Sequence, residues 1–247
     1  MCFGIEMSAI FAVSGLFSSY FLKTRGMKFS FYFPIAYFSI MEIFQSIQYF
    51  SISHNLHDLN VMTTMLSYIH ICFQPLFFNM FQCGYKNDNE RTYTNIVYPL
   101  CILGGLGMLL RLKHFSSLYD HLYEYFLNMH TIDTCSCTNY VDYFESNRTL
   151  AFIGAENHVG WEINLFKPIY LTYGLNLHGF LTFYLPIAVE KRITLPTLTY
   201  FVGMIFSSFL SNNLHVQPAI WCLIHIPISI LGICVCFWQK PVLSKQE

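Results

Sequence analysis

The chain has 247 residues, of which 54% are hydrophobic, 18% are aromatic and only 11% are charged. An ordinary soluble domain carries about 25% charged residues, so 13 basic and 14 acidic side chains are too few to cover a soluble protein of this length. A net charge of -1, with no basic patch that interleaves aromatic residues, excludes nucleic acid as a partner. The mean hydropathy of +0.43 predicts that the lipid bilayer surrounds most of the chain.

The first apolar segment covers residues 3–22. It has no basic residue before it, and Lys23, Arg25 and Lys28 follow it. This order of charges is typical of a retained helix with its N-terminus outside, and a cleaved signal peptide has the opposite order.

Seven apolar runs are each long enough, at about 20 residues, to cross the hydrocarbon layer as a helix. They predict an all-α integral membrane protein, a single seven-transmembrane-helix domain over residues 1–247. The runs are residues 3–22, 30–50, 61–83, 94–112, 168–189, 193–211 and 218–238.

The lysines and arginines predict the orientation of these helices. If the seven spans alternate, nine basic residues fall on one side, and only Arg111, Lys113, Arg148 and Lys167 fall on the other. The richer side is expected to be cytoplasmic, in a plasma or other cellular membrane. The N-terminus is then outside, and the C-terminal tail, residues 239–247, is cytoplasmic.

The one long connection, residues 113–167, is therefore predicted to form an acidic external lid between the fourth and fifth helices. Asn147-Arg148-Thr149 within it is an N-glycosylation sequon on the correct side of the membrane.

Three of the nine cysteines, Cys2, Cys135 and Cys137, lie on the predicted outer side, where the compartment is oxidising. Two cysteines separated by one residue bridge each other poorly. We therefore expect a disulfide from Cys2 to Cys135 or Cys137, with zinc binding by the Cys-x-Cys pair as the alternative.

Ionisable side chains within a span are costly and by default indicate function. At 1.5 Å per residue, Glu42 lies ~12 Å and His70 ~13 Å below the outer membrane edge, on the second and third helices. His225 at ~10 Å and His178 at ~15 Å fall in the same layer.

Further polar residues extend this layer into a predicted outward-open pocket. Gln45 and Gln74 share helix faces with Glu42 and His70. The remaining candidates lie nearer the surface or on the third helix, and Trp161 and Trp221 are either pocket residues or aromatic residues of the membrane interface. These candidates are Glu6, Asn79, Trp161, Gln217 and Trp221.

The segment His158-Val-Gly-Trp-Glu162 offers a metal site if it is helical, since His158 and Glu162 then project from one face. With Glu42 and His70 they make a candidate ligand set for a divalent metal such as zinc. The competing interpretation is that polar residues such as Gln74 and His178 only join helices, at about 1 kcal/mol each.

Several motifs resemble an uncharacterised multi-pass membrane family of bacteria and large DNA viruses, catalogued as a domain of unknown function. The stretches are residues 1–9, 37–45 (Tyr-Phe-Ser-Ile-Met-Glu-Ile-Phe-Gln), 68–79 (beginning Tyr-Ile-His-Ile-Cys-Phe-Gln-Pro), 161–162 and 218–222 (Pro-Ala-Ile-Trp-Cys). The likeness covers nearly the whole chain and implies no known activity. It places on motif positions Glu6, Glu42, Gln45, His70, Gln74, Asn79, His158, Trp161, Glu162, Pro218 and Trp221.

Two functions from different classes remain. In the first, Glu42, His70 and Glu162 line a pocket that binds a cation, a proton or a small ligand from outside, as in a transporter, channel or receptor. In the second, a zinc ion held by Glu42, His70, His158 and Glu162 activates water against a lipid amide or ester. A retinal pump is disfavoured, because no lysine lies midway along the seventh helix.

Overall fold

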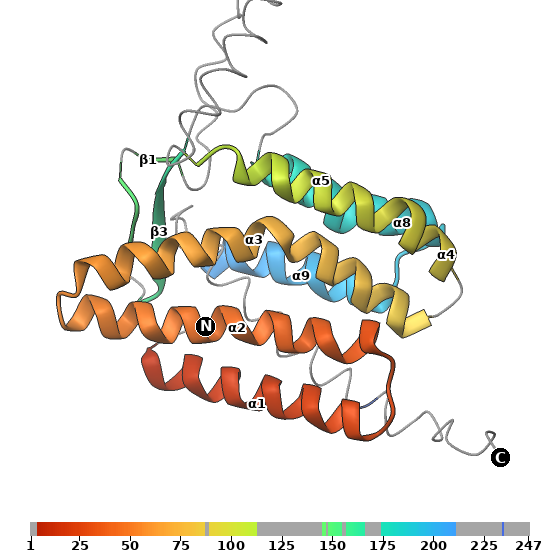
Figure 1. The fold of residues 1–247 in the computed structure, drawn as a ribbon, viewed down its shortest axis with the longest axis horizontal. Coiled ribbons are helices and arrows are strands. Elements are labelled where there is room, and N and C mark those ends of the chain that lie inside the picture. Colours follow the sequence, from red (N-terminus) through yellow and green to blue (C-terminus); the bar gives the residue numbers. More distant parts are fainter. Residues whose placement is uncertain are drawn as a thin grey trace, which may run out of the picture.

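The computed structural model describes residues 4–86, 89–112, 145–146, 148–154, 157–165, 174–210 and 234. Three long antiparallel helices lie side by side at the N-terminal end of the chain (Figure 1). They are α1 (Ile5–Thr24), α2 (Phe29–Ser53) and α3 (His57–Lys86).

A second group of helices packs on α3. The first member is a continuous helical segment of α4 (Glu90–Thr92), η1 (Tyr93–Val97) and α5 (Tyr98–Leu109). The second is α7 (Gly174–Gly179), η3 (Phe180–Tyr184) and α8 (Leu185–Glu190), which contacts α3 and α5 and is followed by α9 (Leu195–Leu210).

These helices coincide with six of the seven predicted apolar runs, with ends that differ by a few residues. Within the described residues, three helices are long and apolar enough to cross a membrane, namely Ile5–Thr24, His57–Tyr85 and Glu90–Leu109. Of the seventh run, residues 218–238, only residue 234 is described.

The predicted external lid contains β-structure, so the expectation of an all-α chain is wrong for this segment. Its strands are β1 (Glu145–Ser146), β2 (Leu150–Ile153) and β3 (Val159–Asn164), in the order β1-β3-β2. β2 is antiparallel to β3, with Ala151 opposite Trp161, and β1 is parallel to β3. We call these three strands the lid sheet.

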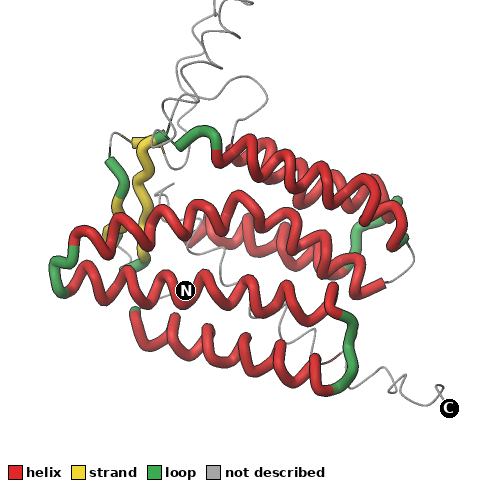
Figure 2. Tube along the Cα trace, viewed as in Figure 1, coloured by secondary structure: helices red, strands yellow, loops and turns green. Residues whose placement is uncertain are grey.

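The lid sheet lies across the end of the bundle where α2 turns into α3 and where α5 ends (Figures 1 and 2). An isolated bridge between Leu112 and Leu165 ties the residues that follow α5 to the residue that follows β3. We call this the lid end of the bundle.

Prolines explain the irregular parts of the helices. The π-helical segments η1 and η3 come directly before α5 and α8, which each have a proline in their first turn, Pro99 and Pro186. Proline has no N–H, so it leaves a carbonyl of the preceding turn without a donor. Such carbonyls need a partner from elsewhere in the bundle.

Two helices supply each other with these partners. A ring nitrogen of His178 on α7 hydrogen-bonds to the backbone of Ile71, the residue whose carbonyl Pro75 leaves without its helical donor. In return, the side-chain amide of Asn79 on α3 donates to the carbonyl of Leu181 in η3, at 2.9 Å. The exchange holds α7 and η3 against α3.

Candidate functional site

A stripe of buried polar side chains follows the contact between α2 and α3 in the half nearer the lid end. On α2 the residues recur every three positions, and on α3 Ser67 follows the adjacent Thr63 and Thr64 by four and three positions and His70 follows Ser67 by three, which keeps each set on one side of its helix. Each is at most 5% exposed. We call this set the polar seam; its members are Glu42, Gln45 and Gln48 of α2 and Thr63, Thr64, Ser67 and His70 of α3.

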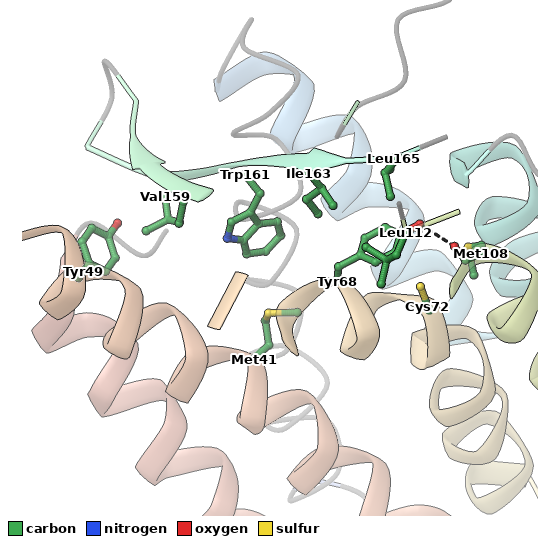
Figure 3. Close-up of a cluster of buried hydrophobic side chains, with 11 residues drawn as sticks. Met41, Tyr49, Tyr68, Cys72, Met108, Leu112, Val159, Trp161, Ile163 and Leu165 are labelled. Atoms are coloured by element: carbon green, nitrogen blue, oxygen red, sulfur yellow. Dashed lines mark hydrogen bonds between the residues drawn. The ribbon is translucent and has the colours of Figure 1, made fainter. Parts of the chain in front are cut away.

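Gln48 links three elements through its side-chain amide. Its Nε2 donates to Ser67 Oγ on α3 at 3.0 Å, and its Oε1 accepts the indole N–H of Trp161 on β3 at 2.9 Å. Figure 3 shows the Trp161 ring pointing from β3 toward α2 and α3. The polar seam is thereby connected to the lid sheet.

Trp161 is completely buried, in a cluster with Met41 and Tyr68 of the helices and with Ile163 and Leu165 (Figure 3). Its interpretation as an aromatic residue of the membrane interface is therefore wrong. The alternation of β3 turns Val159, Trp161 and Ile163 toward the helices.

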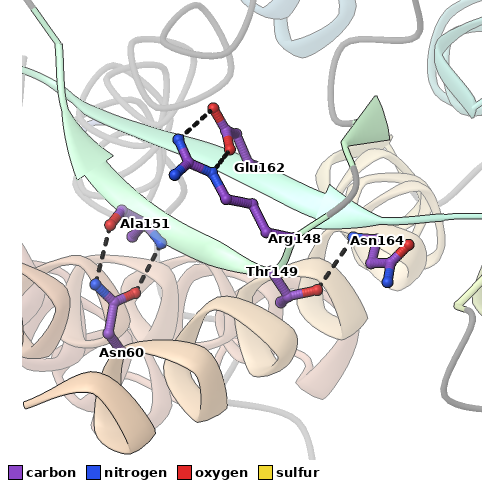
Figure 4. A network of polar contacts seen from close by, with 6 residues as sticks. All are labelled: Asn60, Arg148, Thr149, Ala151, Glu162 and Asn164. Atoms are coloured by element: carbon purple, nitrogen blue, oxygen red, sulfur yellow. Dashed lines mark hydrogen bonds and ion pairs between the residues drawn. The ribbon is translucent and has the colours of Figure 1, made fainter.

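Asn60, in the second turn of α3, fixes the edge of the lid sheet. Its side-chain amide accepts a hydrogen bond from Ala151 N at 2.7 Å and donates to Ala151 O at 2.9 Å, as a neighbouring strand would (Figure 4). Tyr49 of α2 adds a hydrogen bond from its hydroxyl to the carbonyl of Asn157, at 2.8 Å. Both helices of the polar seam therefore hold the lid sheet.

His70 is held by Tyr37 of α2 through two hydrogen bonds and a ring contact. The Tyr37 hydroxyl donates to the carbonyl of His70 at 2.6 Å, and Nε2 of His70 lies 2.8 Å from the carbonyl of Tyr37. The two rings stack with centroids 4.0 Å apart. Because a carbonyl oxygen only accepts, Nε2 of His70 carries the proton. The predicted contact between His70 and Glu42 stays a prediction.

Glu162 lies on the face of β3 opposite to Trp161, where it forms an ion pair with Arg148 (Figure 4). This pairing raises the pKa of the Arg148 guanidinium. The expectation that Glu162 lines a pocket together with Glu42 and His70 is therefore wrong, because its neighbour Trp161 occupies the face of β3 that is turned toward the helices.

The helical interpretation of residues 158–162 is also wrong, since β3 begins at Val159. His158 itself is buried, at 2% exposure, directly before this strand. In the described ranges, no three His, Cys, Asp or Glu side chains gather closely enough to hold a metal ion. The predicted set of Glu42, His70, His158 and Glu162 is thus not assembled there.

Three further predicted pocket residues lie away from the polar seam. Glu6 is exposed in the first turn of α1. Gln74 is half-buried on α3, one turn beyond His70. Asn79 is fully buried, but it lies nine residues, or ~13 Å, from His70 along α3, where it donates to Leu181 as described above.

The remaining predicted residues lie outside the part of the chain that the structure describes. They are the disulfide candidates Cys2, Cys135 and Cys137, the sequon residue Asn147, and Gln217, Trp221 and His225.

Sequence reasoning missed Tyr37, Asn60, Thr63, Thr64 and Ser67. A signal for the last four was present, because Asn60 is followed at three or four residues by Thr63 and Thr64, these by Ser67, and Ser67 by the predicted His70. The link from Gln48 to Trp161 spans 113 residues and has no local signature.

Comparison with known proteins finds one family. The model of a family of unknown function (DUF5765) matches residues 6–242. No curated protein and no solved structure matches the chain. Since the match covers nearly all of the sequence, the chain belongs to this family of unknown function.

Proposed function

We propose that this protein is a seven-span membrane protein of a multi-pass family, with its N-terminus and lid sheet outside the cytoplasm and its C-terminus within it. The proposal is supported by the low charge content, by the three helices that are long and apolar enough to cross a membrane, and by the nine-to-four distribution of basic residues.

α2 needs a separate argument, because it is not among those three helices. Its 25 residues are long enough to span, at about 37 Å. Glu42, Gln45 and Gln48 lower its hydropathy, yet all three are buried, and Gln48 hydrogen-bonds to Ser67 of α3 and to Trp161 of the lid sheet. A span can carry such residues when they face the bundle interior.

The polar seam is the proposed site of function. In this proposal it binds a cation, a proton or a small polar ligand that arrives from the outer side, and the protein acts as a transporter, channel or receptor. The carrying observation is the burial of Glu42, at 1% exposure, in the middle of α2. Burying a carboxylate at this depth costs free energy. Elsewhere α2 packs on α3 without a carboxylate, so packing alone does not require Glu42.

A stability screen of the purified protein in detergent tests this function. Ions of different charge, protons and small polar solutes are added one at a time, and the midpoint of thermal unfolding is measured. We expect at least one of them to raise the midpoint in wild type and not in Glu42→Gln. Glu6→Gln is the matched control, because Glu6 is exposed.

If no addition raises the midpoint of wild type, or if Glu42→Gln responds as wild type does, the polar seam is only a packing feature. Bound zinc in the purified protein, lost in Glu42→Gln, would instead favour the metal-dependent hydrolase. Topology is tested independently with tags, and we expect a C-terminal tag to be protected in sealed cells and a tag within residues 113–167 to be accessible.

A further inference from the structure

Basic residues gather at the end of the bundle opposite the lid end. Three connections lie there (Figure 1): residues 23–28 between α1 and α2, residues 86–91 between α3 and α4, and residues 190–194 between α8 and α9. Together they contain seven basic and three acidic residues, a net charge of +4. The connection from α2 to α3 at the lid end, residues 54–60, contains one acidic residue and no lysine or arginine. We call the positively charged end the basic end.

Two contacts join the connections of the basic end. Nζ of Lys28, directly before α2, lies 3.4 Å from a carboxylate oxygen of Glu90 at the start of α4. The hydroxyl of Thr194, directly before α9, donates to the side-chain oxygen of Gln82 on α3 at 2.6 Å. The positive charge therefore forms one region. Its exposed basic side chains are Lys23, Arg25, Lys28, Arg91, Lys191 and Arg192.

α1 turns its large apolar side chains away from the helix on which it packs. The side buried against α2 carries small residues, namely Ser8, Ala12, Gly15, Ser18 and Ser19. The opposite side carries four large residues, spaced by three or four positions, that are between 57% and 67% exposed. We call them the outer stripe; they are Ile10, Val13, Phe17 and Tyr20. The stripe is ~15 Å long, about the depth of the hydrocarbon in one leaflet of a bilayer.

The outer stripe ends beside basic residues. Lys23 lies in the last turn of α1, three positions after Tyr20, and Arg25 follows the helix. The guanidinium carbon of Arg25 lies 4.9 Å from the centroid of the Phe21 ring, and this cation–π contact keeps the charge next to the apolar surface. Phe21 follows Phe17 by four positions and so borders the stripe. An apolar surface with a cationic end is complementary to a molecule that has an apolar chain and an anionic head.

We propose that α1 binds an anionic phospholipid of the cytoplasmic leaflet, with Lys23 and Arg25 at the headgroup and the outer stripe along an acyl chain. This inference rests on the orientation in the proposed function, which puts the basic end at the cytoplasmic surface. Anionic lipids are enriched in that leaflet, and basic residues beside a membrane helix attract them. Lys28 contributes less, because Glu90 is its partner.

The test is native mass spectrometry of the purified, delipidated full-length protein in detergent. Phosphatidylglycerol and phosphatidylcholine with identical acyl chains are titrated separately, and the lipid-bound fraction is measured. We expect phosphatidylglycerol to bind wild type at least tenfold more tightly. The double variant Lys23→Gln with Arg25→Gln should weaken phosphatidylglycerol binding about thirtyfold and leave phosphatidylcholine binding unchanged. Phe17→Ala should weaken the binding of both lipids about fivefold, because part of the acyl-chain contact is lost.

The matched control is Lys191→Gln with Arg192→Gln. It removes the same charge from the same end of the bundle, but from the connection between α8 and α9, so phosphatidylglycerol binding should change less than threefold. Glycerol phosphate, which carries the charged head without acyl chains, should not displace phosphatidylglycerol at equal concentration.

Equal binding of the two lipids to wild type, or equal losses in the two double variants, would overturn the inference. Displacement by glycerol phosphate would assign the basic residues to a soluble anion, and a dimer that needs Phe17 and excludes lipid would assign the outer stripe to a second copy of the chain; either result would also overturn it. The proposed function fails separately. Reversed labelling of the tags would overturn its orientation, whereas a loss of lipid selectivity with the expected labelling would overturn only the inference.

Discussion

The two halves of the contact between α2 and α3 are built from different kinds of side chain. The half nearer the lid sheet is the polar seam. The other half contains a cluster of aromatic and aliphatic residues and a glycine, which we call the apolar seam; these are Phe31, Ile35 and Phe38 of α2 and Phe78, Phe81 and Gly84 of α3. The rings of Phe31 and Phe81 stack with centroids 5.0 Å apart.

The backbones of α2 and α3 come close together in the apolar seam. A Cβ atom added to Gly84 would lie 2.7 Å from the backbone nitrogen of Phe31, so only glycine allows this approach. Small residues that bring backbones together are a common basis of helix packing in membranes. In the apolar seam, α2 and α3 therefore pack through rings, aliphatic side chains and a close approach of their backbones, without a buried carboxylate. The polar seam carries groups that packing does not require.

The strongest test of this comparison removes the side chain that covers the polar seam. Trp161→Ala deletes a fully buried indole and should lower the free energy of unfolding by about 3–5 kcal/mol, because it leaves a large cavity under β3. Trp161→Phe keeps most of the ring and loses the N–H donated to Gln48, so it should cost much less. Denaturant titration in detergent measures both, and equal stabilities of wild type and Trp161→Ala would show that the lid sheet does not pack on the seam.

A single added methyl group, in Gly84→Ala, is expected to disrupt the packing of α2 on α3 in the apolar seam. Gly84→Ala should cost about 1–3 kcal/mol, because the clash is with backbone atoms that cannot move without separating the helices. Gly179→Ala is the control, since its added Cβ meets its nearest neighbour at 3.8 Å. The same titration applies, and tolerance of Gly84→Ala would contradict the close approach of α2 and α3.

Ser67→Ala sharpens the contrast from the polar side. It removes two hydrogen bonds, one accepted from Gln48 and one donated to Thr63 O, and should lower the free energy of unfolding by only about 1–2 kcal/mol. Its effect on ligand binding should be larger than its effect on stability. A loss of stability as large as that of Gly84→Ala, with binding unchanged, would make the polar seam a packing element.

The smallest effect is expected on the outer face of the lid sheet. Arg148→Gln breaks the ion pair with Glu162, but the Arg148 side chain is largely exposed and solvent screens the interaction. We expect no measurable change in the midpoint of thermal unfolding and no change in ligand binding. A clear change in either would mean that Glu162 has a role at the polar seam after all.

The positions of the helices could be predicted from the sequence, because in a chain with so few charged residues a long apolar run has few possible structures other than a membrane helix. The burial of Glu42, Gln45 and His70 also followed from their spacing on two helices. α2 shows the limit of hydropathy alone, since the residues that lower its apolar character are buried in the fold, and one of them, Gln48, contacts α3 and β3.

The lid sheet was misread for a physical reason. His158 and Glu162 are four residues apart, which fits one face of a helix, but alternating residues also share one face of a strand. The alternation of Trp161, Ile163 and Leu165 with Glu162 and Asn164 was present in the sequence and favoured the strand. The contact of Asn60 with Ala151 depends on residues 91 positions apart, which no local pattern encodes.

The central claim is that Glu42 in the polar seam takes part in binding, and infrared difference spectroscopy tests it most directly. Spectra of the reconstituted protein are recorded before and after addition of the ion or solute that raises the midpoint of thermal unfolding of wild type. We predict a change in the carboxylate bands of wild type and of Glu6→Gln that is missing in Glu42→Gln. A carboxylate change that persists in Glu42→Gln, or none in wild type, would contradict the claim.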